Sequence, residues 1–221
     1  MSDSPYAAAA EGVRGSALAQ REHGKRARNA ITRGELGQYV HVDRDAVALI
    51  EKQNESRVPD LVSLRRERMG ESPFAFFRGT AGLMAHDLAH QPSTEVQVVI
   101  CGDAHIGNFG LYASPERRII FDLNDFDEAA PGRGEWDLRR LATSAFLAAE
   151  ENGASSDEAT SVAVHTAKAY VKQLRGFLKM PPTTRHHVAL DETLAVQTVP
   201  AATMPLFDAA VKRHDGGPQQ E

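Results

Sequence analysis

Apolar residues recur at helical spacing over most of the chain, which predicts a mostly helical fold. The longest stripes lie in residues 136–152 and 155–180, where apolar positions repeat every three or four residues. Two shorter helices are predicted over residues 43–56 and from Pro59 to Gly70. An aspartate begins the first of these, while a proline begins the second and a glycine ends it.

Alternation of apolar and other residues is confined to the middle of the chain. Residues 96–100 alternate as a strand does, and residues 109–112 and 118–123 predict the two arms of a hairpin. A turn is predicted between the arms at residues 114–116. The predicted fold class is therefore α+β, mostly helical, with a small antiparallel hairpin.

Polar residues gather where these predicted strands end. Asp103, His105 and Asn108 follow the first strand, and Asp122, Asp125 and Asp127 lie at the exit of the hairpin. We expect the oxygens of Asp103, Asn108 and Asp125 to converge, and such a set suits Mg²⁺. An aspartate five residues before an asparagine, with another aspartate after a hairpin, is also typical of phosphoryl-transfer enzymes. The alternative is that these residues only satisfy loop backbone groups.

Gly102-Asp103-Ala-His105-Ile-Gly107-Asn108 resembles the catalytic loop of aminoglycoside and choline kinase-like phosphotransferases. The segment 124–129 resembles their metal-binding segment, and Asp137 lies where they have the aspartate that braces the loop. The resemblance implies that Asp103 orients or deprotonates the attacking hydroxyl. It implies that Asn108 and Asp125 hold Mg²⁺, with Asp127 or Asp122 assisting, and that ATP is the phosphate donor. It also implies a fold similar to the catalytic lobe of a kinase.

A more specific resemblance covers residues 20–180 and includes Ser72–Gly79, the Gly-Asp motif and Phe121–Glu128. It is to a bacterial family known as domain of unknown function two-two-five-two, placed beside the kinase-like folds. The chain looks like the N-terminal half of that family. A Gly-rich or lysine-bearing nucleotide segment is not recognisable, so we expect a truncated product, a fragment, or a half completed in trans. We expect such a chain alone to bind ATP weakly.

Two further residues of the motifs admit more than one role. Arg78 stands among three phenylalanines, so we expect a partner such as Asp137, Glu135 or a substrate phosphate. For His105 we favour hydrogen bonding within its own loop, because zinc would need further ligands in register.

The composition of the chain indicates a globular protein and argues against nucleic-acid binding, disulfide bonds and membrane spans. The 221 residues are 42% hydrophobic and 25% charged, which is ordinary for a globular protein with a real core. The formal net charge of -5 gives no general attraction to nucleic acid. The single cysteine, Cys101, excludes an internal disulfide and fits a reducing cytoplasm. No apolar run is long enough to predict a membrane span.

The predicted organisation is a mobile basic arm over residues 1–30, a kinase-like catalytic-lobe region over 31–180 and a weakly ordered segment over 181–221. The predicted function is a Mg²⁺-dependent phosphotransferase acting on a small-molecule or protein hydroxyl, incomplete in this chain. The alternatives are a catalytically inactive binding or regulatory remnant and a metal-dependent phosphohydrolase.

Overall fold

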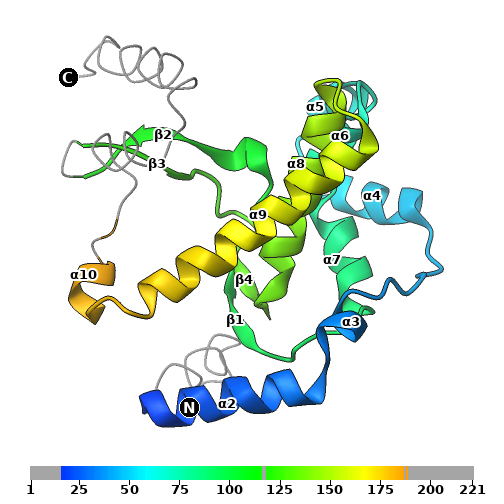
Figure 1. Cartoon of the computed structure of the whole chain (residues 1–221). Helices are drawn as coiled ribbons and strands as arrows, with labels where there is room; N and C mark the ends of the chain where they lie inside the picture. The colour runs from blue at the N-terminus through cyan, green and yellow to red at the C-terminus, as the bar shows by residue number, and fades with distance from the viewer. Residues whose placement is uncertain (1–15, 116–117, 187, 189–221) are drawn as a thin grey trace, which may run out of the picture. The chain divides into compact units, whose positions relative to one another are not determined.

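The computed structural model describes residues 16–115, 118–186 and 188 (Figure 1). The chain divides into two compact units, one formed by residues 1–106 with 125–170 and the other by 107–124 with 171–221. The described helices are α2 (Ala17–Ala30), α3 (Arg33–Leu36), α4 (Ala46–Asn54), α5 (Pro59–Met69), α6 (Pro73–Arg78), α7 (Ala81–Ala89), α8 (Glu135–Glu151), α9 (Ser156–Phe177) and α10 (Pro182–His186). The described strands are β1 (Gln97–Ile100), β2 (Phe109–Ala113), β3 (Ile119–Leu123) and β4 (Ala130–Arg133).

The helix boundaries follow capping residues that are visible in the sequence. The side chain of Asp45 accepts a hydrogen bond of 2.9 Å from the Ala48 amide and begins α4. Ahead of α9, Ser155 and Glu158 form the reciprocal bonds of a capping box, since each side chain accepts from the other residue's amide. The predicted helices over residues 43–56 and from Pro59 are confirmed.

The structure places helix α2 inside the segment for which the sequence predicts a mobile arm. The hydroxyl of Ser16 accepts a hydrogen bond of 3.2 Å from the Ala19 amide, which caps the helix. Alanine, arginine and glutamine within α2 have high helix propensity, so the segment needs no apolar stripe to become helical. Residues 1–15, and residues 189–221 of the predicted C-terminal segment, lie outside the described part of the chain.

Two small antiparallel sheets confirm the α+β class. In the second unit β2 pairs with β3 from Phe109↔Leu123 to Ala113↔Ile119, so the predicted hairpin is correct. In the first unit β1 pairs with β4 from Gln97↔Arg133 to Ile100↔Ala130. The proline and glycines of residues 131–134 predict a loop after the second acidic motif. The structure instead has strand β4 there, so that prediction is wrong.

Gly132 is one reason why the sequence does not predict β4 as a strand, because glycine is rare within strands. A Cβ atom on Gly132 would lie 2.5 Å from the Ile100 Cδ1 atom, so any other residue at this position would force the Ile100 side chain to move. A proline is tolerated because a two-stranded sheet has only edge strands.

The core of the first unit lies around α8, which contacts both α6 and α7 (Figure 1). Its buried residues include two polar ones, Arg140 and Ser144, beside Ala145. The buried apolar side chains that this unit draws from other elements include Met69, Leu83, Leu88 and Ile100. The centre of this unit is therefore partly polar.

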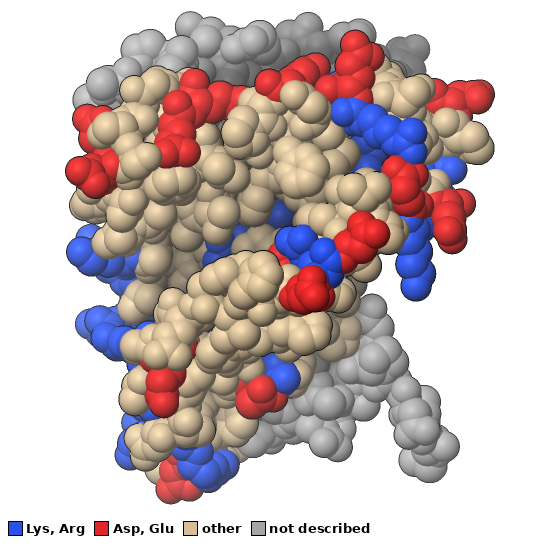
Figure 2. Space-filling view, turned by 90° about the vertical axis from the view of Figure 1, so that its right-hand side faces the viewer, with Lys and Arg blue, Asp and Glu red and all other residues tan. Residues whose placement is uncertain are grey.

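Charges of both signs occur together on one face of the molecule. On the face shown in Figure 2, acidic and basic side chains are interspersed over a surface made mostly of uncharged residues. Within the described part of the chain, none of the helices combines the length and apolar character that crossing a membrane requires.

An ion pair between Arg44 and Asp87 links the segment before α4 to α7. The Arg44 Nε and Nη2 atoms donate to the two Asp87 oxygens, the second at 2.7 Å. The hydrogen bond from Arg44 is the main cause that lowers the pKa of Asp87. Because this pKa is lower in the folded state, the pair stabilises the fold above about pH 4 and its contribution is lost as the pH falls through the folded pKa.

We therefore predict that Asp87→Asn removes about 1 kcal/mol of stability at neutral pH, the upper range for an ion pair in contact with water. Urea unfolding between about pH 7 and pH 2 should show a smaller acid-induced loss for the variant than for the natural chain. Parallel pH profiles for the two proteins would contradict the assignment.

Candidate functional site

The Asp103 loop, residues 101–106, leaves strand β1 and is fixed by helix α8. The Asp137 carboxylate accepts hydrogen bonds from the backbone amides of Cys101 at 2.7 Å and Gly102 at 3.0 Å. Gly102 has a φ of 84°, a left-handed conformation that glycine adopts without strain. The loop therefore turns sharply against the N-terminal end of α8.

Three polar side chains on one face of α8 contact successive parts of this loop. Asp137 binds its start, Arg140 donates to the Asp103 carboxylate, and the Ser144 hydroxyl accepts a bond of 2.9 Å from the Ile106 amide. The spacing of three and then four residues places all three on one side of a helix. The start, the middle and the end of the loop thus each have a hydrogen-bond partner on a single rigid element.

The second acidic motif packs against the first. We call residues 125–128 the Asp125 turn. The Cys101 thiol donates to the Asp125 carbonyl oxygen at 3.2 Å, and a Cβ atom on Gly102 would lie 2.3 Å from the Glu128 carbonyl oxygen. The two motifs, separated in sequence by the hairpin, are therefore in backbone contact within the first unit.

The Cys101 thiol, which joins the two motifs, lies near three negatively charged carboxylates. Burial is the main cause that raises the pKa of Cys101, and the charges of Asp137, Asp103 and Asp125 raise it further. The thiol accordingly stays protonated and can donate to the Asp125 carbonyl. It takes the place of the histidine that precedes Gly-Asp in the phosphotransferases that the sequence resembles.

The Asp103 carboxylate meets a buried arginine that sequence reasoning missed. Arg140 is 2% exposed, and its Nε atom donates to Asp103 Oδ1. Its Nη2 atom donates to the Phe77 carbonyl at 2.9 Å, and its guanidinium carbon lies 4.4 Å from the centre of the Phe77 ring. The available signal was its position three residues after Asp137, on the same face of a predicted helix.

Hydrogen bonding of His105 within its own loop, which the sequence favours, involves the backbone of this residue and not its Nδ1 atom. Its ring is buried, and its Nδ1 atom has no hydrogen-bond partner among the described residues. The Nε2 atom lies 3.8 Å from Asp103 Oδ2, beyond hydrogen-bond distance. Burial is the main cause that lowers the pKa of His105, so the ring is neutral at pH 7. The hydrogen bond within the loop is instead made by the backbone, from the His105 amide to the Asp103 carbonyl at 2.8 Å.

Arg78 is exposed and does not pair with either carboxylate predicted for it. Asp137 accepts from the Asp103 loop, and Glu135 accepts from Thr94 at 2.8 Å. The Arg78 side chain extends into solvent beside the site, where its charge helps to lower the pKa of His105. Within the described part of the chain, the arginine that is buried and lies over a phenylalanine ring is Arg140.

The predicted metal ligands lie on different elements: Asp125 and Asp127 in the turn after the hairpin, Asp122 on β3, and Asn108 at the end of a short 3₁₀ helix, Ile106–Asn108. Asp125 and Asp127 are both exposed, and Asp125 Oδ1 accepts a bond of 3.0 Å from the Asp127 amide. In the second unit the Asn108 carbonyl accepts from the Asn124 amide at 2.9 Å, and Asp122 accepts from the Leu123 amide at 2.8 Å. Among the described residues, three or more histidine, cysteine, aspartate or glutamate side chains nowhere gather as a metal site.

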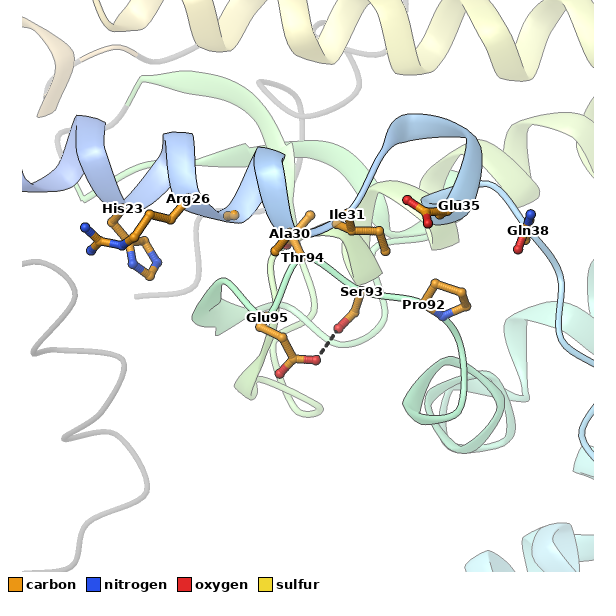
Figure 3. A pocket seen from close by; sticks show the side chains of 11 residues that line it. His23, Arg26, Ala30, Ile31, Glu35, Gln38, Pro92, Ser93, Thr94 and Glu95 are labelled. Carbon is orange, nitrogen blue, oxygen red and sulfur yellow. Dashed lines mark hydrogen bonds between the residues drawn. The ribbon is translucent and has the colours of Figure 1, made fainter.

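A hollow of about 620 Å³ lies between α2 and the segment before β1, and it contains none of the predicted site residues. In Figure 3, His23 and Arg26 project from α2, and Ser93 donates to Glu95 below them. The lining residues are His23, Arg26, Ala27, Ala30, Ile31, Glu35, Gln38, Pro92, Ser93, Thr94 and Glu95.

Comparison with known proteins identifies one family. A family model described as "Uncharacterized protein conserved in bacteria (DUF2252)" matches residues 57–219. Neither the curated proteins nor the solved structures give a significant match to the chain. The match covers both acidic motifs and helix α8.

The contact between Gly102 and the Glu128 carbonyl can be tested by substitution. Gly102→Ala should destabilise the protein by about 3 kcal/mol, because left-handed strain adds to a clash with backbone. Gly153 is a matched control, since it has a similar φ of 89° and nothing within 4 Å of a Cβ atom. Gly153→Ala should cost only about 1 kcal/mol in urea unfolding. Equal losses in the two variants would mean that the motifs are not in contact.

Proposed function

The chain belongs to this bacterial family of uncharacterised proteins, and we propose that it is a Mg²⁺-dependent phosphotransferase of the kinase-like kind. ATP is the proposed phosphate donor, and a hydroxyl of a small molecule or protein is the proposed acceptor. The observation that carries the proposal is the contact between the Asp103 loop and the Asp125 turn. A fixed carboxylate to orient the hydroxyl and exposed acidic residues to hold Mg²⁺ are two of the parts that phosphoryl-transfer enzymes share.

In this proposal Asp103 orients the attacking hydroxyl. The transition state of phosphoryl transfer is loose, so positioning matters more than strong basicity. A carboxylate with Oδ1 bound to a buried guanidinium suits this role, because its orientation is fixed. Asp137 supports the same role by bonding two consecutive amides next to Asp103.

The Asp125 turn supplies the protein ligands for Mg²⁺ in this proposal. Mg²⁺ is commonly held by one or two carboxylates together with substrate phosphates, rather than by a cage of protein ligands. Asp125 and Asp127 fit this need, because both are exposed and neither has a cationic partner within the described part of the chain. Bound Mg²⁺ would offset the charge of the phosphates. Asn108 as a further ligand stays a prediction from the sequence.

Arg78 is the proposed phosphate contact of this chain. Its guanidinium is exposed, lies near enough to His105 to influence its pKa, and has no partner within the described residues. A guanidinium fork matches two phosphate oxygens. Of the partners that the sequence offered for Arg78, this proposal chooses a substrate phosphate over Asp137 or Glu135.

A catalytically inactive binding role is the second candidate. It is favoured by the ion pair between Asp103 and Arg140, because one carboxylate oxygen is already engaged by a structural cation. Measurements of metal binding and of turnover separate the two candidates, since a binding protein would show the first without the second.

We predict that millimolar Mg²⁺ raises the melting temperature by about 3 °C, as expected for a ligand that binds the folded state. Asp125→Asn should remove most of this gain, because one of two ligand carboxylates is lost. Asp157→Asn is the matched control, since Asp157 is an exposed aspartate in the first turn of α9. A gain that survives in the Asp125 variant would count against the metal site.

We also predict that Asp103→Asn lowers phosphoryl transfer from ATP at least about 100-fold, the usual range for an acid–base or orienting group. Asp87→Asn, which lies in the Arg44 ion pair, should stay within about twofold of the natural chain. Release of ADP in the presence of candidate hydroxyl acceptors measures both. Equal turnover by the natural chain and the Asp103 variant would refute the assignment of Asp103.

A further inference from the structure

Arg140 uses each of its side-chain nitrogens in a different contact. Its Nε atom donates to the Asp103 carboxylate, its Nη2 atom to the Phe77 carbonyl at 2.9 Å, and its Nη1 atom lies 3.6 Å from the Met84 sulfur. A weaker contact of 3.4 Å joins Nη2 to the carbonyl of Arg78. The guanidinium therefore connects the Asp103 loop with the C-terminal end of α6.

The geometry of a guanidinium makes these contacts directional. Its donors point outward in one plane, so a carboxylate bound to Nε and a carbonyl bound to Nη2 are fixed relative to each other. The Phe77 ring below the plane, at 4.4 Å from the guanidinium carbon, restricts its tilt. A lysine could supply the charge but not this fork.

The neighbouring histidine cannot replace Arg140 as the partner of Asp103. His105 Nε2 lies 3.8 Å from the Asp103 carboxylate, and the Phe74 ring contacts the imidazole edge-on at 6.5 Å between centres. Burial lowers the pKa of His105, and the charges of Arg140 and Arg78 add to this effect while Asp103 opposes it. His105 is therefore uncharged and lies beside the ion pair without taking part in it.

We propose that Arg140 is a positioning residue that sets the orientation of the Asp103 carboxylate relative to the backbone at Phe77 and Arg78. This inference rests on the proposed function, because positioning matters only if Asp103 and Arg78 act on one substrate. A carboxylate that orients a hydroxyl must stay within about 0.5 Å of its productive place, and a buried fork provides that restriction.

The adjacent Arg139 is a matched control for a purely structural role. It lies on the same helix and donates to the carbonyl oxygens of Leu36 and Pro92, the second at 3.4 Å. It makes no hydrogen bond to the Asp103 loop among the described residues. Loss of Arg139 therefore tests what removing an arginine from α8 does to stability alone.

The experiment follows the pKa of His105 by NMR, with the resonance assigned through His105→Gln. Arg140→Lys keeps the charge that repels a protonated His105 but loses the fork. A rise of the His105 pKa in this variant therefore reports movement of the Asp103 carboxylate toward the ring. Arg140→Met removes the charge as well and should raise the pKa further, by about one unit. Arg139→Met should leave it unchanged.

The double variant Asp103→Asn with Arg140→Met removes both charges and tests the origin of the shift. It should abolish the part of the rise that comes from Asp103 and should recover stability lost in the single Arg140 variant. An unchanged His105 pKa in both single Arg140 variants would overturn the inference. An equal rise in the Arg139 variant would also overturn it, because the effect would then be a general loosening of α8.

Turnover separates this inference from the proposed function. If the natural chain transfers phosphate, Arg140→Lys should lower kcat about tenfold or more while KM for ATP changes by less than about threefold. An unaltered kcat in that variant would refute the positioning role. If the natural chain shows no turnover with any acceptor, the proposed function fails, and the His105 titration still decides whether Arg140 orients Asp103.

Discussion

A buried guanidinium must have its charge compensated and its donors satisfied, and Arg140 imposes this constraint on the first unit. Leaving such a charge unpaired costs several kcal/mol, so the fold has to bring an acceptor to each side of it. The Asp103 loop supplies the carboxylate and α6 supplies a carbonyl and an aromatic face. The partly polar centre of this unit is thus a structural requirement as well as a candidate site.

Helix α8 transmits this constraint to the rest of the motif region. Asp137, Arg140 and Ser144 lie on one face and bind the loop at its start, its middle and its end. Since these contacts come from one helix, the loop cannot change shape without breaking several hydrogen bonds together. The Asp125 turn is then placed by contacts with the loop, through the Cys101 thiol and the close approach at Gly102. The region combines a fixed carboxylate with exposed acidic residues.

That combination is the physical basis of the proposed phosphotransferase. A fixed group orients an acceptor, and exposed carboxylates can exchange water for a metal-bound phosphate. The exposed Arg78 adds a cation of the shape that phosphate oxygens match. The same features explain why an inactive binding role is the second candidate function. The ion pair between Asp103 and Arg140 can stabilise the fold whether or not the protein catalyses a reaction.

The sequence by itself determined helices α4, α5, α8 and α9 and the hairpin, because periodicity and capping are local properties that act within a few residues. It also identified the acidic motifs and Asp137. It did not predict β4, where Gly132 pairs with Val98 and lies close to the Ile100 side chain of the distant strand β1. Nor did it predict that Arg140 rather than Arg78 is the buried cation, because burial depends on which helix face meets the core. The tertiary structure decided these points, since partners of a buried charge come from segments that are distant in sequence.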